Sequence, residues 1–260
     1  MKTFVTRSFL WFALGFALAN CFLLASVAQQ APANPPASPQ PQAAGQSKDI
    51  ADPKTSPGTS NDRLFYALPN FLTLENSGNV PPLTAGQKFK VVARGTFDYI
   101  QIPWYSALAG ISQAENSEPG YGQGAQGYGK RWGAAFADGS IENFMTGAVL
   151  PSLLRQDPRF FQSSQGGFFH RTEYAVSRIF ITRGDSGHHQ FNFSEIFGSA
   201  AAAAISTYSY HPQADRTLPN TASVWGTQVG YDTITIVVKE FWPDLRRKLS
   251  KKKQPPSNPG

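Results

Sequence analysis

Apolar residues along most of the chain recur at spacings of three and four, the period of a helix that buries one face. One such run covers residues 132–154. Its apolar positions are Trp132, Phe136, Ile141, Phe144, Met145, Val149 and Leu153. We expect Pro151 to bend this helix and Asp157-Pro158 to end it, because proline lacks an amide and disfavours a helical conformation in the preceding residue.

Further helices are predicted for residues 84–103, 174–182, 192–205 and 223–249. Thr84 and Gln87 fit a capping box, in which each side chain bonds the other residue's backbone amide. Asn192 and Glu195 fit an N-cap followed by an acid in the first turn. Residues 233–238 also fit a strand, because all six are β-branched, and that alternative stays open.

Composition divides the chain into an export signal, a linker, one domain and a tail. Residues 29–60 are rich in Pro, Ala, Gln and Ser and contain no aromatic residue, so we predict a disordered linker. Residues 61–249 run without a second such break and form one domain. Residues 250–260 are basic and Pro-rich, and we expect them to be disordered. The predicted fold class is mostly α, a single compact helical bundle-like domain.

Residues 1–28 have the three parts of a signal peptide. Lys2 and Arg7 supply the basic start, residues 9–19 the apolar segment, and Ser26-Val27-Ala28 the small-x-small cleavage pattern. We therefore expect an exported protein. The alternative is an uncleaved anchor that leaves it membrane-associated, because apolar character resumes after the first run.

Cysteine content and charge distribution exclude several classes of function. Cys21, the only cysteine, lies within the signal, so a cleaved product has no disulfide, thiolate zinc site or cysteine nucleophile. The chain has 23 Lys and Arg against 17 Asp and Glu. Two cations belong to the signal and six to residues 246–253, so the body is nearly neutral and a nucleic-acid partner is not expected. The basic tail predicts attraction to an anionic membrane or envelope surface. Protein partners stay open.

Small residues recur at intervals of four and predict close contact between helices. The positions are Gly129, Gly133, Ala137, Gly198, Ala202, Gly226 and Gly230. The alternative is that Gly and Ala are simply common in this chain. No segment of the body has the roughly 18 strongly apolar residues expected of a membrane-spanning helix.

Histidines near acids are the candidates for acid–base or metal chemistry. On a helix, His170 and Glu173 share a face, and His188 follows Asp185 closely. A metal-dependent hydrolase or another enzyme centred on these four residues is therefore one hypothesis. The competing interpretation is a structural or surface role, because His188 falls in a glycine-containing loop where solvated histidines are ordinary. We favour the second and expect no bound metal.

Arginines gather between two turns and form a candidate anion-binding or ion-pair cluster. They are Arg155, Arg159, Arg171, Arg178 and Arg183. Bidentate pairing with neighbouring acids is the first interpretation, and a lipid- or anion-binding module is the second.

The glycine-rich residues 122–130 contain partial matches to phosphate-loop and dinucleotide patterns. Arg131 stands where the phosphate loop requires Ser or Thr, and neither pattern follows an apolar strand. We therefore expect a structural loop and no cofactor.

Three segments resemble a family of uncharacterised exported bacterial proteins. They are residues 127–138 (GYGKRWGAAFAD), 150–161 (LPSLLRQDPRFF) and 192–198 (NFSEIFG). The resemblance covers most of the body and implies a bacterial envelope context, but it supplies no activity and no catalytic residue. With the signal and the helical pattern, it predicts a non-enzymatic structural or interaction protein of the cell envelope.

Overall fold

The apolar run that begins at Trp132 folds into one helical column with three consecutive parts. These are α4 (Gly124–Phe144), a π-helical turn (Met145–Val149) and α5 (Leu150–Leu153). Pro151 lies in the first turn of α5, where its missing amide costs no hydrogen bond. The column ends before β4 (Gln156–Asp157), so the predicted end at Asp157-Pro158 is confirmed to within a few residues.

The computed structural model describes residues 58–75 and 80–252. The predicted signal, nearly all of the predicted linker and residues 253–260 of the tail lie outside this part. The described residues belong to one compact unit, and their fold is mostly helical, which confirms the predicted fold class.

The predicted helix 84–103 is two helices, α2 (Ala85–Thr96) and α3 (Gln101–Glu115). The capping box at the start of α2 is confirmed, because the Thr84 side chain accepts from the Gln87 amide and the Gln87 side chain accepts from the Thr84 amide. The break precedes Pro103, which lies in the first turn of α3 where proline is tolerated.

The remaining helices are longer than predicted, but residues 181–182 of the predicted helix 174–182 form a strand, and residues 250–252 of the predicted disordered tail are helical. These helices are α6 (Phe168–Phe180), α7 (Phe193–Ser209) and α8 (Leu218–Lys252). Asn192 caps α7 by accepting from the Glu195 amide at 3.2 Å, as predicted. The alternative of a strand at residues 233–238 is wrong, because α8 continues through this segment and through Pro243.

Short strands tie the helices together. β4 pairs with β6 (Ile181–Gly184), and β6 pairs with β7 (His189–Phe191), both antiparallel. β3 (Thr73–Leu74) pairs in parallel with β5 (Phe160–Phe161). β1 (Arg63–Leu64) and β2 (Leu68–Pro69) form a hairpin. Single turns of 3₁₀-helix lie at Pro119–Tyr121 and Gln213–Asp215.

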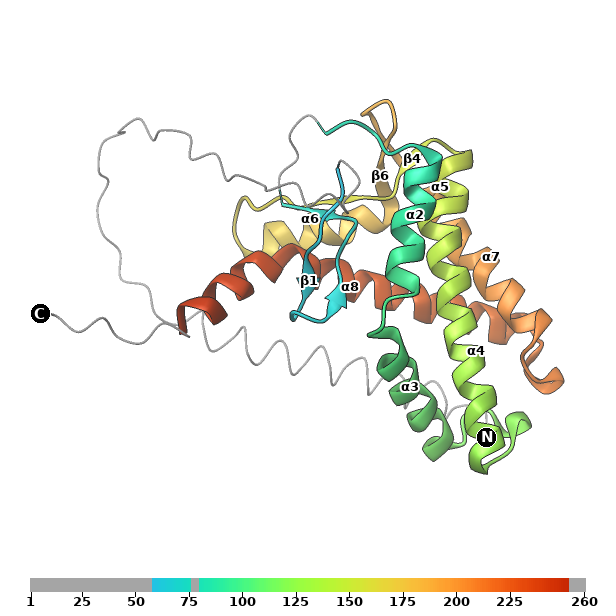
Figure 1. Cartoon of the computed structure of the whole chain (residues 1–260). Helices are drawn as coiled ribbons and strands as arrows, with labels where there is room; N and C mark the ends of the chain where they lie inside the picture. The colour runs from blue at the N-terminus through green and yellow to red at the C-terminus, as the bar shows by residue number, and fades with distance from the viewer. Residues whose placement is uncertain (1–57, 76–79, 253–260) are drawn as a thin grey trace, which may run out of the picture. The chain divides into compact units, whose positions relative to one another are not determined.

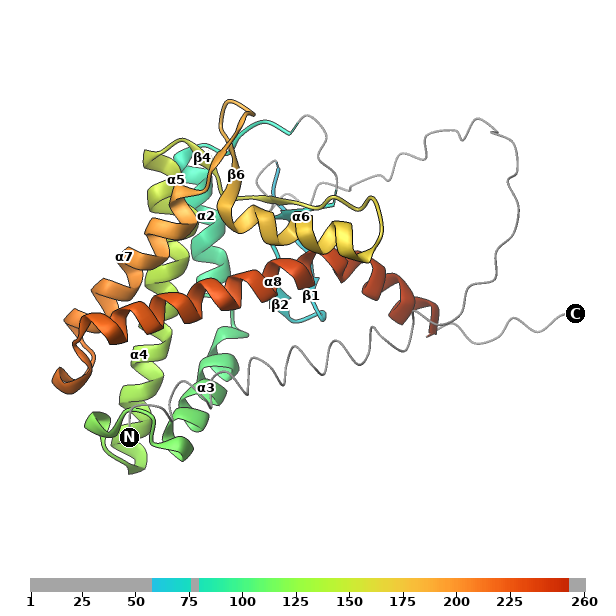
Figure 2. The same cartoon turned by 180° about the vertical axis from the view of Figure 1, so that it is seen from behind.

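In Figure 1, α4 lies between α2 and α7, with α3 packed along the lower part of α4. Figure 2 shows α8 from the other side, with its first part crossing α7 and its later part running along α6. The indole of Trp225 in α8 donates to Ser199 of α7 at 3.0 Å, and this bond fixes the crossing.

Charged side chains are buried in this domain while many large apolar side chains are exposed. Lys88, Arg131 and Glu240 are among the largest fully buried side chains. Phe169 and Leu153, by contrast, are exposed to 86% and 72%. Among the described residues, no helix combines the length and apolar character that crossing a membrane requires.

Candidate functional site

A cavity of about 130 Å³ lies where the β4–β5 segment, α6, α7 and α8 meet. Its polar lining includes Arg178 of α6, Glu195 of α7, and Asp232 and Lys239 of α8. Thr146, in the π-helical turn that follows α4, also lines the cavity. Such turns are frequent at functional sites. The cavity is therefore a place where polar side chains from separate elements meet.

Three carboxyl groups from three helices interact beside this cavity. Asp232 of α8 is hydrogen-bonded to both Glu142 of α4 and Glu195 of α7. Oxygen Oε1 of each glutamate is buried and receives no hydrogen bond from the donors of the described residues. Two carboxyl groups can bond to each other only when one of them carries a proton, so the cluster holds protons.

Burial raises the pKa values of these acids. Desolvation, followed by the charge of Asp232, raises the pKa of Glu142 to about 9. The same two causes raise the pKa of Glu195 well above its usual range. Desolvation also raises the pKa of Asp232, and its two acid neighbours and Lys239 oppose that rise only in part. Glu142 is thus protonated at neutral pH, and its hydroxyl can donate to the carboxylate of Asp232.

The local sequence explains how these acids reach the interior. Glu195 is the single charged residue of α7 and sits in its first turn. Asp232 stands in an apolar run of α8. Sequence analysis missed the cluster, although this isolation was a signal that could have found it.

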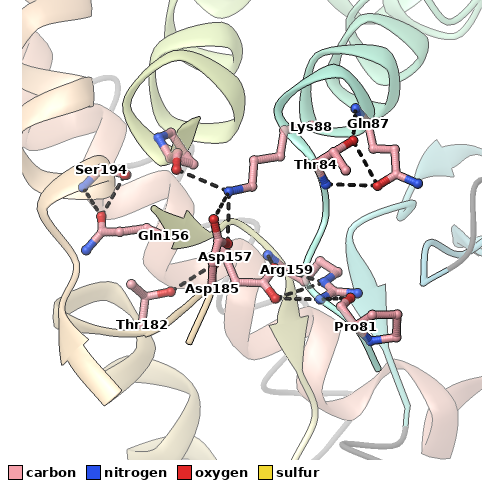
Figure 3. A network of polar contacts seen from close by, with 11 residues as sticks. Pro81, Thr84, Gln87, Lys88, Gln156, Asp157, Arg159, Thr182, Asp185 and Ser194 are labelled. Carbon is pink, nitrogen blue, oxygen red and sulfur yellow. Dashed lines mark hydrogen bonds and ion pairs between the residues drawn. The ribbon is translucent and has the colours of Figure 1, made fainter. Parts of the chain in front are cut away.

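A network of satisfied polar contacts supports the cavity wall (Figure 3). Gln156 of β4 accepts from the amide of Ser194 at 2.8 Å, and its own amide donates to the Phe191 carbonyl at 2.7 Å. Arg159 and Asp157 form a fully buried ion pair at 2.6 Å. These contacts hold β4 against the start of α7 and leave the two charges of the pair neutralised.

The candidate histidine site is dispersed. His170 and Glu173 are exposed on α6, and His188 is exposed in the turn between β6 and β7. Asp185 is bound to the buried Lys88 of α2 at 2.9 Å (Figure 3). Within residues 58–75 and 80–252, no group of three or more His, Cys, Asp or Glu side chains is arranged to hold a metal ion.

The structure brings only some of the five arginines of the candidate cluster together. Arg159 and Arg183 lie over the same Phe161 ring, and Arg159 and Arg178 line the same cavity. Arg159 pairs with Asp157, and Arg171 pairs with Glu240 rather than with the neighbouring Glu173. Arg155 is exposed. Arg183 lies over the Phe161 ring and donates to the Gly187 carbonyl. Arg178 lines the cavity.

The predicted small-residue contacts are found at some positions and not at others. A Cβ at Gly198 would meet Met145 and Thr146 at 3.2 Å, and Ala202 is buried, so α7 packs closely there. A Cβ at Gly129, Gly133, Gly226 or Gly230 would meet nothing within 4 Å. These four positions are exposed, which corrects the expectation of helix packing there, and Ala137 is half-buried.

Comparison of the chain with protein-family models, with curated proteins and with solved structures finds no match in any of the three.

Proposed function

We propose that this protein is an exported component of the bacterial cell envelope that binds a lipid membrane surface and has an interaction role rather than a catalytic one. The signal-like residues 1–28 support export. The exposed face of α7 supports the membrane contact. We call the outward side chains Phe193, Phe197, Ile205 and Tyr208 the outer α7 face.

The observation that carries the proposal is the inverted polarity of α7. Its outer face consists of large apolar or aromatic side chains that are exposed to between 44% and 57%. Its inward side holds Ser194, Glu195 and Ser199. In an ordinary helix of a globular protein the polar side faces water. The outer α7 face therefore requires an apolar environment.

The aromatic surface continues beyond α7. Ile181 of β6 is the register partner of Phe191 of β7. The Phe191 ring lies 5.0 Å from that of Phe193, which in turn lies 5.9 Å from that of Phe197. A continuous exposed apolar patch of this kind marks an interaction site. Aromatic side chains suit the membrane interface, where one end of the ring system is apolar and the other wet.

The basic end of α8 would add electrostatic attraction. Arg246 bridges Asp62 and Glu75, and Arg247 pairs with Asp244, so these two cations are already partly neutralised. Lys248 and the lysines that follow it are the cations we propose to act on an anionic surface, each worth up to about 1 kcal/mol close to the membrane.

The test is flotation of the exported protein with vesicles of phosphatidylcholine alone and of phosphatidylcholine with phosphatidylglycerol. The double variant Phe193→Ser/Phe197→Ser should lower binding to both, by roughly a hundredfold, because two phenylalanine side chains contribute about 3 kcal/mol or more. The matched control is Tyr99→Ser/Phe169→Ser, which alters two exposed aromatic residues elsewhere. Removal of residues 251–260 should weaken binding only to the anionic vesicles and only at low salt.

Absence of flotation by the parent protein contradicts the proposal. So does equal loss in the two double variants, since any exposed aromatic residue would then serve. Identical binding of full-length and truncated protein at low salt removes the tail from the proposal and leaves the outer α7 face.

A further inference from the structure

The ribbon formed by β6 and β7 carries apolar and basic side chains on one face, next to the outer α7 face. In its register Ile181 lies opposite Phe191, and Arg183 lies opposite His189. Alternate residues of a strand point to the same side, so these four side chains share one face of the ribbon. Thr182 points to the other side and is buried. Figure 2 shows the ribbon rising where the end of α6 meets the start of α7.

A second arginine joins Arg183 and His189 at this face. Arg178, in the last turn of α6, approaches Nδ1 of His189 at 3.4 Å. Because a guanidinium can only donate, Nδ1 accepts and the imidazole carries its proton on Nε2. Each guanidinium lies over an aromatic ring, Arg178 over Tyr174 at 5.6 Å and Arg183 over Phe161 at 5.3 Å from the ring centroid. This stacking holds both arginines in place.

The acids next to this face are already neutralised by other cations. Asp157 is the register partner of Arg183 on the β4 side, and Asp185 directly follows β6. Asp157 is paired with Arg159 at 2.6 Å, and Asp185 is paired with the buried Lys88 at 2.9 Å. The ribbon face therefore keeps a net positive charge.

At neutral pH the positive charge belongs to the two arginines, and His189 adds a hydrogen-bond donor. Desolvation, followed by the charges of Arg178 and Arg183, lowers the pKa of His189. Beside these groups, Ile181 and Phe191 are each exposed to 42%. The Phe191 ring continues the apolar surface onto the outer α7 face, so the cations border the surface for which we propose a membrane contact.

We propose that the β6–β7 ribbon binds the phosphate groups of anionic lipids, with Arg178, Arg183 and His189 as the donors. This inference rests on the proposed membrane contact of the outer α7 face and names the lipid class that the contact selects. Apolar side chains enter the membrane interface while cations beside them stay at the level of the headgroups. The planar guanidinium matches the geometry of a phosphate, and its charge favours anionic over neutral headgroups.

The experiment is flotation of the full-length exported protein at low salt with vesicles of phosphatidylcholine alone and of phosphatidylcholine with phosphatidylglycerol. The double variant Arg178→Gln/Arg183→Gln should weaken binding to the mixed vesicles by about tenfold, because it removes two cations near an anionic surface. Its binding to phosphatidylcholine should stay within about twofold of the parent. The matched control Arg94→Gln/Lys130→Gln removes two exposed cations on α2 and α4, and its binding to both vesicles should stay within about twofold.

The ribbon and the outer α7 face fail in different ways. If the parent floats with both vesicles and Arg178→Gln/Arg183→Gln binds the mixed vesicles as well as the control does, the ribbon proposal is overturned and the outer α7 face stands. If the parent floats only with the mixed vesicles and the same double variant weakens that binding, the ribbon proposal is supported and the outer α7 face is contradicted. Absence of binding to either vesicle overturns both.

Because Arg178 also packs on Tyr174, a measurement that needs no variant is required as well. Amide hydrogen exchange of the vesicle-bound parent should be slower in residues 182–191 on the mixed vesicles than on phosphatidylcholine, since contact with the headgroups protects the ribbon. Residues 193–208 of α7 should exchange equally on the two, because their contact is apolar. Equal exchange of residues 182–191 on both vesicles overturns the proposal.

Discussion

Arg171 of α6 donates a hydrogen bond of 2.8 Å from Nε to Glu240 of α8, whose side chain is completely buried. The backbone amides of Ser163 and Ser164 donate to the same carboxylate at 3.0 and 3.1 Å. Arg171 also donates to Asp244. One guanidinium thus fixes α6, the preceding loop and α8 against one another, across 69 residues of sequence.

Replacement of Arg171 by Met should destabilise the domain by about 3–5 kcal/mol, because Glu240 would remain buried without a cation. Arg247→Met is the matched control. It removes the other arginine bound to Asp244, but 70% of its side chain is exposed, so the loss should stay below about 1 kcal/mol. Urea unfolding measures both. Equal midpoints for the two variants would mean that the buried pair does not hold α6 on α8.

Because of the carboxyl cluster, we expect the domain to lose stability as the pH rises. The pKa of Glu142 is raised from 4.5 to about 9, so the folded protein keeps a proton that the unfolded chain releases. This contribution is fully present below pH 4.5 and is lost as the pH rises toward 9. Glu142→Gln keeps the shape and removes the titration, so it should exceed the parent in stability by about 2 kcal/mol at the alkaline end.

Thermal melting across this pH range tests the prediction, with Glu115→Gln, an exposed acid, as the control. The control should follow the parent. Parallel melting curves of Glu142→Gln and the parent at every pH would contradict a protonated cluster.

His211 makes a second contribution with the same dependence on pH. Desolvation lowers its pKa, but hydrogen bonds to Asp138 and Glu118 outweigh that effect and raise it from 6.5 to about 10. Its ring nitrogens lie 3.2 Å and 3.0 Å from these carboxylates. The stabilisation is fully present below pH 6.5 and is lost as the pH rises through about 10.

His211→Gln should therefore cost about 2 kcal/mol near pH 6, after allowance for the screening of its partly exposed partners, and little near pH 10. The control is His188→Gln in the exposed turn. Chemical unfolding at the two pH values is the measurement. A constant difference between His211→Gln and the parent would show that the histidine is not charged in the folded protein.

We expect replacement by alanine to have opposite effects on stability at two glycines near the start of α4. A Cβ at Gly127 would overlap the carbonyl of Gly122, whose carbon lies 2.7 Å away. That carbonyl accepts from the buried Arg131 at 2.6 Å. Gly127→Ala should therefore destabilise the domain by about 1–3 kcal/mol. Gly129→Ala meets nothing within 4 Å and should stabilise it by up to about 1 kcal/mol, because alanine favours a helix. Melting temperatures that change in the same direction would refute this assignment.

The sequence by itself determined the helical character of the domain and several helix starts. The capping box of Thr84 and Gln87 and the N-cap at Asn192 were predictable because these bonds join residues three positions apart. The end of the long column before Pro158 was predictable for the same reason, since proline acts on its immediate neighbour. Local chemistry suffices wherever the partners are close in sequence.

The partner of each charged side chain and the residues gathered around the cavity were decided only by the tertiary structure. Arg171 had Glu173 beside it in the sequence but pairs with Glu240, and Glu142, Glu195 and Asp232 come from three helices. Likewise, Gly198 packs closely while Gly133, with the same spacing, is exposed. Such outcomes depend on how each helix is rotated about its axis and which neighbour it meets, and periodicity along one helix does not contain that information.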